Sequence, residues 1–468
     1  MNKKADGTGE KQQPKKSIFV SINNGLDIAY DGFIKFINQW GFLIIALIIT
    51  ALAMTLRIAF FDRNNGDIYW YQIPWVTWYR EGSHNGINSF AEMPISFYNC
   101  HGDSTPYSGW SQYLSDCNNG LVSSVTYCDY LMGYLNLLAL FSYLPVDAMY
   151  VCKIIAICSD LIAALGIAML AWKLTKGDKL YTLICYCLYL VLPTIFINSG
   201  VWGQCDGLYA CLIIWCIYFT ITKKPWFAMM FLGFALATKL QAVFIIPVFA
   251  FLWLRKEFKL RWVLIIPIAM LLMMIPAYIA GMDFLMPWKQ YFSQVGSYKG
   301  ANYNSGSFYV IFTGIDVSAY VNWFGIPLCL IAIILALFII WRMKIKVTPI
   351  STLAVAALFA ILVPFFLPHM HERYFYLADV FVFIYCMLRK KRYWLIPLMQ
   401  FSSFNAYTIF LFGSSNVIIP TIGIRVLYIS MFLNFIIMSV IFWDILKMEK
   451  EAPVLTVYES DHHKKMAD

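Results

Sequence analysis

The feature that most restricts the fold of this chain is a series of apolar segments near 20 residues long, many of them ending in lysines and arginines. An α-helix of about 20 residues crosses the hydrocarbon core of a bilayer. Charged residues make up only 13% of the chain, whereas they make up about a quarter of an ordinary soluble domain. The sequence therefore predicts an all-α polytopic membrane protein.

The basic clusters predict which side of the membrane each segment end faces, because lysines and arginines concentrate on the cytoplasmic side. The lysine-rich residues 1–18 precede the first span, so the N-terminus is expected inside, without a cleavable signal peptide. Placing successive connections alternately inside and outside then gives about 12 crossings, two of them short, and a cytoplasmic C-terminus. The predicted spans are 41–61, 148–172, 180–198, 207–222, two short helices in 225–254, 262–280, 322–341, 350–367, 374–388, 394–412 and 424–446.

This alternation divides the chain into three regions. Residues 1–40 are expected to form a cytoplasmic tail and an interfacial helix, with a partner-binding helix as the alternative, and residues 447–468 a second tail. Residues 41–446 form the membrane domain, with a first outer loop at 62–146 and a second at 281–321. The first loop includes a short apolar run, 130–144. A crossing there would reverse the sides of all later basic clusters, so we expect juxtamembrane helices in this loop instead.

A second inference from charge concerns residues 225–254. One long span would place the basic cluster that begins at Arg255 outside, whereas two short helices meeting at Lys239 near the outer face keep it inside. Interrupted helices of this kind often form binding sites in membrane proteins.

A polar sequence, Pro368–Tyr374, interrupts the apolar residues 350–388. It contains His369, His371, Glu372 and Arg373. Ionisable groups near hydrocarbon are costly and by default indicate a functional site. The alternative is a polar turn between two spans.

Other ionisable residues fall at the same predicted outer level. A channel or transporter would spread such groups through the membrane, so this one-sided set indicates an interfacial site that a lipid reaches from the side. Asp160 is the deeper exception, and we expect it to be a structural partner of Lys153 on the same helix face. The outer set is Arg57, Asp67, Lys153, Asp206, Lys239, Glu372, Arg373 and Arg425.

These residue types indicate phosphate chemistry. Arg373 and Lys239, with Lys153, Arg57 and Arg425 as further candidates, suit a phosphate or pyrophosphate group. Asp67 could act as a general base toward a hydroxyl. Alternatively, it is a loop carboxylate beside the interfacial aromatic residues 69–71.

The motifs that contain these residues resemble those of the bacterial integral membrane glycosyltransferases of the GT-C superfamily that are related to GPI mannosyltransferases. The resemblance extends from about Arg57 to Tyr376, and its most specific parts are Trp202-Gly203-Gln204 and Met370-His371-Glu372-Arg373. The remaining motifs are Gly66–Tyr69, Ile73–Trp75, Gly133–Leu135 with Leu144-Pro145, Lys153 with Asp160, and Lys239–Gln241.

The resemblance implies a hexosyltransferase-type enzyme of the cell membrane that faces outside. It would transfer a sugar, with inversion, from a polyprenyl-phosphate-linked donor to a hydroxyl of a cell-surface or cell-wall glycan or a glycolipid. Asp67 would be the catalytic base, and the phosphate would be bound by Arg373, His371, Lys239, Lys153, Arg57 and Arg425. Gln204, Asp206, Gln241 and Glu372 would orient the sugar or the cations, and His369 has no assigned role.

No cofactor, metal or nucleic acid is expected. Two histidines and a glutamate within one four-residue turn cannot easily all face one ion. A glycine-rich phosphate fingerprint is missing from the sequence, so we expect no nucleotide-sugar domain. The net charge of +9 lies in short clusters between spans, which is typical of membrane topology rather than nucleic-acid binding.

Residues 82–129 are longer than the matching connection in the enzymes that the chain resembles. Trp110 and Tyr113 there, and Asn304 in the second outer loop, are candidate contacts to the acceptor. The alternative for residues 82–129 is a lid or packing insertion. One disulfide is possible among its three cysteines, Cys100, Cys117 and Cys128.

Two other functions remain open on the sequence. A polysaccharide polymerase or ligase would use pyrophosphate-linked glycans. A lipid-linked sugar flippase would need polar residues along a full transmembrane path, and the one-sided polar set argues against it.

Overall fold

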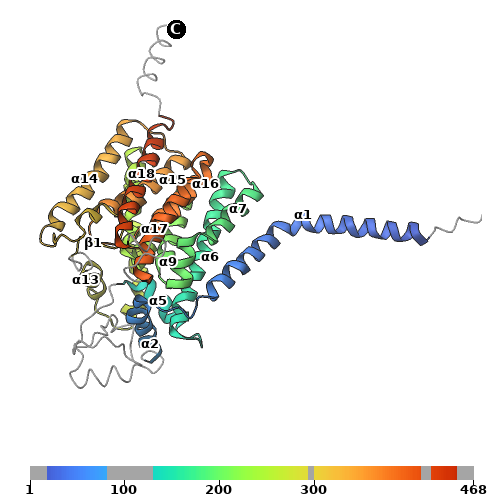
Figure 1. Ribbon diagram of the computed structural model, residues 1–468, viewed down its shortest axis with the longest axis horizontal. Helices are drawn as coiled ribbons and strands as arrows, with labels where there is room; N and C mark the ends of the chain where they lie inside the picture. Colours follow the sequence, from blue (N-terminus) through green and yellow to red (C-terminus); the bar gives the residue numbers. More distant parts are fainter. Residues whose placement is uncertain (1–17, 82–129, 294–299, 413–422, 451–468) are drawn as a thin grey trace, which may run out of the picture. The chain divides into compact units, whose positions relative to one another are not determined.

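The computed structural model describes residues 18–81, 130–293, 300–412 and 423–450 (Figure 1). Two compact units divide the chain, Met1–Ala51 and Leu52–Asp468, and the bundle and site described below belong to the second. Among the described residues, seven helices are long and apolar enough to cross a membrane, and an eighth is added if one bent pair counts as a span. Five shorter apolar helices accompany them, so the prediction of about 12 crossings is not confirmed as a count.

The first helix, α1, extends without interruption from Ile18 to Ile58. The interfacial helix and the first span, which the sequence suggested as separate elements, are therefore one helix. Glycine costs a helix about 1 kcal/mol, whereas proline costs about 3 kcal/mol. This segment contains glycines but no proline, so nothing in it is strong enough to end the helix.

The predicted interruption at Lys239 is confirmed. Helix α10 (Pro225–Thr238) ends there, and Lys239 has extended backbone angles, φ −154° and ψ 136°. The short 3-10 segment η4 (Leu240–Ile245) and helix α11 (Ile246–Leu254) follow.

The span predicted at 180–198 is bent in the structure. Helix α7 (Lys179–Leu190) is followed at an angle of 51° by Pro193–Trp202, which comprises α8 (Pro193–Phe196) and the π-helical segment η3 (Ile197–Trp202). Pro193 is the reason, because proline cannot continue a helix from the residues before it.

One helix at the centre of the bundle is buried on all sides. In α15 (Pro349–Phe366), every residue from Ser351 to Phe365 is buried, as expected for a helix that is apolar all round. It lies beside α14 (Val321–Arg342), α16 (Tyr376–Leu388) and α18 (Val426–Leu446), and α17 (Leu395–Phe412) packs against the last two (Figure 1). A second group combines α6 (Ala148–Leu174), α7, α9 (Asp206–Ile221), α10 and α12 (Ile265–Ile279).

The helix ends that the charge alternation assigns to one side also meet in space. On the predicted inner side, Lys223 pairs with Glu257, Lys346 with Glu449, and Arg392 with Asp444. On the predicted outer side, Arg373 pairs with Asp67. Helix α15 connects the two sides, and its 18 residues rise about 27 Å, close to the thickness of the hydrocarbon core. Which side faces the cell exterior stays a prediction.

Short elements cover the predicted outer end. Segment η1 (Ile68–Gln72), α2 (Ile73–Glu81) and α5 (Met132–Phe141) belong to the first outer loop. Helix α5 has 10 residues, a rise of about 15 Å, so it is too short to cross. The second outer loop contains α13 (Met286–Ser293) and η6 (Phe308–Phe312). Residues 82–129, with Trp110, Tyr113, Cys100, Cys117 and Cys128, lie outside the described residues.

A two-stranded parallel sheet, which the all-α prediction did not include, joins the second outer loop to the polar sequence at 368–374. Strand β1 (Asn302–Tyr303) pairs with β2 (Met370–His371). His369 strengthens this junction: its backbone N–H donates to Ala301 O at 2.9 Å. Its ring nitrogens lie 2.6 Å from Gly300 O and 2.6 Å from Asn322 Oδ1. His369 is thus a structural residue of this junction.

Candidate active site

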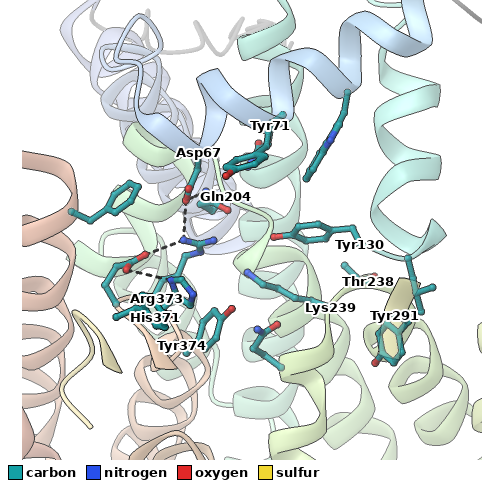
Figure 2. Close-up of a pocket in the computed structure, with 17 residues that line it drawn as sticks. Asp67, Tyr71, Tyr130, Gln204, Thr238, Lys239, Tyr291, His371, Arg373 and Tyr374 are labelled. Carbon is teal, nitrogen blue, oxygen red and sulfur yellow. Dashed lines mark hydrogen bonds and ion pairs between the residues drawn. The ribbon is translucent and has the colours of Figure 1, made fainter. Parts of the chain in front are cut away.

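A cavity of about 300 Å³ lies where the first outer loop, the break at Lys239 and the polar sequence at 368–374 meet (Figure 2). Its lining includes seven residues that the sequence predicts for the site: Asp67, Gln204, Lys239, Gln241, His371, Glu372 and Arg373. The other lining residues are Tyr71, Gln72, Trp75, Tyr130, Leu131, Thr238, Tyr291, Tyr303, Tyr374 and Phe410.

One oxygen of Asp67 accepts three side-chain hydrogen bonds. Asp67 Oδ2 accepts from Gln204 Nε2 at 2.7 Å, from Arg373 Nη1 at 2.8 Å and from Trp202 Nε1 at 3.2 Å. Among the described residues, no donor is assigned to Oδ1. The side chain is 20% exposed and points into the cavity (Figure 2). The carboxylate is therefore held in orientation while one oxygen remains accessible.

Local structure places Asp67 in this position. Asn65 Oδ1 accepts the backbone N–H groups of Asp67 and Ile68, and Asn65 Nδ2 donates to Trp202 O at 3.0 Å. Gly203 ends η3 with φ +70°, and a Cβ there would lie 2.7 Å from Ile68 Cδ1. Only glycine fits both the left-handed backbone and this close approach.

Arg373 lies among three carboxylates. Its Nη1 donates to Asp67 and, at 3.0 Å, to Glu372 Oε1, and its Nε lies 3.4 Å from Asp206 Oδ2. The guanidinium carbon also lies 5.5 Å from the centre of the Trp202 ring. Because the side chain is only 13% exposed, these interactions are weakly screened by solvent.

Lys239 has a comparable environment. Its Nζ lies 2.5 Å from Asp206 Oδ1. Three tyrosine rings, those of Tyr130, Tyr209 and Tyr374, surround the ammonium group at 5.8–5.9 Å. The extended backbone at the break between α10 and η4 is what allows this lysine to leave the helix and reach the site.

The charges of the site nearly cancel. Three carboxylates (Asp67, Asp206, Glu372) face two cations (Arg373, Lys239), a formal charge of −1. Burial raises the pKa of Glu372 to about 7, although Arg373 opposes this shift. Burial, together with Arg373 and Lys239, lowers the pKa of His371 to about 3, so this imidazole is neutral at physiological pH. The cations are already paired, and an anion would have to share them with the carboxylates.

His371 is oriented by the small sheet. Its ring stacks on Tyr303 with centroids 4.8 Å apart and an angle of 10° between the planes. Nδ1 lies 3.9 Å from Glu372 Oε2. Among the described residues, no group of three or more His, Cys, Asp or Glu side chains is placed to bind a metal ion.

The sequence profile of glycosyltransferase family 87 matches residues 130–368, slightly more than half of the 468-residue chain. The chain belongs to glycosyltransferase family 87. It is a multi-pass membrane protein of this family, and glycosyl transfer is its class of activity. No curated protein sequence matches the chain.

The family 87 match and the cavity overlap only in part. The matched range includes Gln204, Lys239 and Gln241, which line the cavity, whereas Asp67 and Arg373 lie outside it. The tertiary structure is what brings these last two residues to the matched part.

Three of the cations predicted to bind phosphate do not line the cavity of this family 87 protein: Arg57, Lys153 and Arg425. Arg57 is fully buried and donates to Asp160 Oδ2 at 2.9 Å and Ser199 Oγ at 3.0 Å. Arg425 is exposed just before α18. Neither side chain lines the cavity, so the geometry gives no support to either residue as a phosphate contact.

Lys153 has a structural role of its own. Its Nζ donates to the backbone oxygens of Phe60, Phe61 and Arg63 at 2.7–2.8 Å, which satisfies carbonyls just after the end of α1. The expected pair with Asp160 is wrong, because seven residues of helix separate the two by about 10 Å along the axis. Asp160 pairs with Arg57 instead.

The sequence reasoning missed the aromatic residues of the site. Tyr71, Trp75 and Tyr374 lie within or beside the quoted motifs, so proximity could have indicated them. Tyr291 and Phe410 carried no such signal. Asn304 lies next to the site through a backbone bridge to His371, but its side chain does not line the cavity.

Proposed function

We propose that this family 87 protein transfers a sugar, with inversion, from a polyprenyl-phosphate-linked donor to a hydroxyl of a cell-surface glycan or glycolipid at the outer membrane face. The observation that carries the proposal is the cavity in which Asp67 has one fixed and one accessible oxygen beside Arg373, His371 and Lys239. A relation to the GPI mannosyltransferases within the GT-C superfamily is part of the same proposal.

Asp67 is the proposed general base. Oδ1 would accept the proton of the acceptor hydroxyl as the oxygen attacks the anomeric carbon. The three donors to Oδ2 hold the carboxylate in one orientation. A fixed carboxylate next to the attacking oxygen is the arrangement that a single-displacement transfer requires.

Arg373 and Lys239 are the proposed contacts to the leaving phosphate. A sugar phosphodiester leaves as a phosphate monoester, which is a stable anion and requires cationic stabilisation rather than a proton. Both cations are held by carboxylates, so they are positioned before a donor arrives. His371, which is neutral, would donate or accept a hydrogen bond rather than contribute charge.

The decisive experiment supplies purified protein in detergent with a polyprenyl-phosphate sugar, or with a polyprenyl-pyrophosphate glycan, and an acceptor extract from the cell surface. We expect sugar transfer from the first donor only, detected by mass spectrometry of the product. In Asp67→Asn, transfer should fall by about 10²–10⁴-fold because the general base is lost, while donor binding persists.

Asp62→Asn is the matched control. Asp62 is an exposed carboxylate five positions earlier that contacts the hydroxyl of Tyr150 and does not line the cavity. It should leave transfer unchanged. Full activity in Asp67→Asn would remove Asp67 from the base role, and transfer from the pyrophosphate donor alone would replace the proposed donor class.

A further inference from the structure

A second cavity, of about 650 Å³, lies at the end of the bundle opposite the candidate active site. It is bordered by the connection between α6 and α7, the start of α15 and the ends of α16 and α18. Its charged lining residues are Asp178, Lys346, Arg389, Lys390, Lys447 and Glu449. It shares no residue with the candidate active site.

The charge of this cavity is positive. Four basic side chains (Lys346, Arg389, Lys390, Lys447) face two carboxylates (Asp178, Glu449), which leaves a formal charge of +2. The carboxylates already have partners: Asp178 accepts the N–H of Tyr181 at 2.9 Å, and Glu449 pairs with Lys346. Both side chains of the Lys346–Glu449 pair are at least half exposed, and ion pairs this exposed contribute little to stability.

Two of the four cations have aromatic neighbours rather than acidic ones. Lys390 Nζ lies 5.3 Å from the centre of the Tyr181 ring, and Lys447 Nζ lies 4.5 Å from that of Trp443. Within the part of the chain that the structure describes, neither lysine is paired with a carboxylate. Their positive charges are therefore available to an anion.

Exposed tryptophans indicate that the cavity lies at a membrane–water boundary. Tryptophan concentrates at the level of the lipid headgroups. Six tryptophans, each 43–56% exposed, lie at or next to the helix ends on this side: Trp172, Trp226, Trp253, Trp341, Trp394 and Trp443. The lining also includes apolar side chains such as Ile350, Leu388 and Met448, which suit the first carbons of a lipid.

We propose that this cavity binds the phosphate headgroup of an anionic membrane lipid. Lys390 and Lys447 contact the phosphate, and the exposed Lys346–Glu449 pair lies beside it. The apolar lining contacts the glycerol and the start of the acyl chains. Basic cavities between membrane helices recognise anionic lipids through this combination of charge and apolar contact. The site is separate from glycosyl transfer, so its existence does not depend on the function proposed above.

The test measures lipid binding by native mass spectrometry of the detergent-solubilised full-length protein. The probes are dioleoylphosphatidylglycerol, dioleoylphosphatidylcholine and glycerol 3-phosphate. Wild type should bind phosphatidylglycerol most tightly. The double variant Lys390→Ala/Lys447→Ala should bind it about 30-fold more weakly, since each lysine near an anionic headgroup is worth about a factor of five.

A matched control separates a defined site from diffuse attraction. Lys179 and Lys391 are exposed at the same end but do not line the cavity, so Lys179→Ala/Lys391→Ala should bind phosphatidylglycerol like wild type. The charge-preserving variant Lys390→Arg/Lys447→Arg should restore binding, which would show that the alanine variant lost charge rather than fold. Equal loss in both alanine variants, no preference over phosphatidylcholine, or equally tight binding of glycerol 3-phosphate would overturn the proposal.

Discussion

Arg373 connects the charged residues of the candidate site. Its guanidinium contacts Asp67 and Glu372 and lies close to Asp206, which in turn pairs with Lys239. Arginine is suited to this position because its planar group presents several donors in fixed directions. Because Arg373 is partly exposed and already bonded to carboxylates, its guanidinium can exchange one of these carboxylate partners for a phosphate oxygen.

Glu372 should link donor binding to proton uptake. Its pKa is about 7 in the free protein, and the negative charge of a phosphodiester nearby would raise it further. Donor affinity is therefore expected to be highest below pH 7 and to fall as pH rises above 7, by up to about tenfold per pH unit. Donor dissociation constants measured between pH 6 and 8.5 would check this.

Glu372→Gln should remove this pH dependence, because the amide stays neutral. His371→Gln is the comparison: with a pKa of about 3, His371 does not titrate in this range, so its variant should keep the slope of the wild type. A wild-type affinity that is constant across the range, or a slope that survives in Glu372→Gln, would contradict proton uptake at Glu372.

At the scale of elements, three irregular segments build the site. The break at Lys239 frees a lysine from its helix, the π-helical η3 directs Trp202 and Gln204 toward Asp67, and the β1–β2 pair orients His371. Each departure from regular structure places a polar side chain at the end of the bundle. This agrees with the general rule that local irregularity in membrane helices accompanies binding sites.

Arg57 offers a test of a structural role against a substrate-binding role. Arg57→Met leaves Asp160 buried without its cation, so it should destabilise the protein by about 3–5 kcal/mol. The double variant Arg57→Met/Asp160→Leu should recover much of this loss, because an apolar pair of similar volume replaces the buried ions. Thermal unfolding in detergent, with intrinsic fluorescence as the signal, provides the measurement.

Arg425→Met is the control, since Arg425 is exposed, and surface changes usually stay within about 0.5 kcal/mol. If Arg57→Met unfolds at the wild-type temperature but binds donor poorly, the structural assignment is wrong, and the phosphate role predicted from the sequence returns.

At the scale of the whole molecule, the two ends of the bundle differ in how their charges are paired and exposed. One end contains a nearly neutral, tightly paired cluster around a cavity, and the other contains most of the exposed basic residues and most of the exposed tryptophans. Because basic residues concentrate on the cytoplasmic side, the basic end is predicted to face the cytoplasm.

Reporter fusions should establish the orientation. Alkaline phosphatase fused after Asp316, in the second outer loop, is expected to be active because it would lie outside the cytoplasm. Green fluorescent protein fused after Lys450, near the predicted inner end, is expected to fluoresce. The reverse pattern would place the candidate active site in the cytoplasm and exclude an outer-face donor.

Much of the architecture could be predicted because it depends on quantities read along the chain. Segment length and apolarity indicate a membrane helix, and the alternation of basic clusters indicates which helix ends share a side. That reasoning was sufficient to expect Asp67, Lys239 and Arg373 together, and the break at Lys239. It did not include the bend at Pro193, which the proline within an otherwise apolar run could have indicated. The sheet at His371 could not be predicted, because it pairs two segments that lie far apart in the chain.

The sequence by itself determined a multi-pass helical membrane protein with polar residues gathered at one end, because hydrophobic thickness and charge bias are properties of local composition. Only the tertiary structure decided which of those residues share a cavity. Arg57, Lys153 and Arg373 are all basic and all at one level, yet the first pairs with Asp160, the second with the carbonyls after α1, and the third with Asp67. The physical reason is that an ion pair or hydrogen bond depends on distances of a few ångströms between helices. The residue pattern along one helix does not specify its distance to the side chains of another.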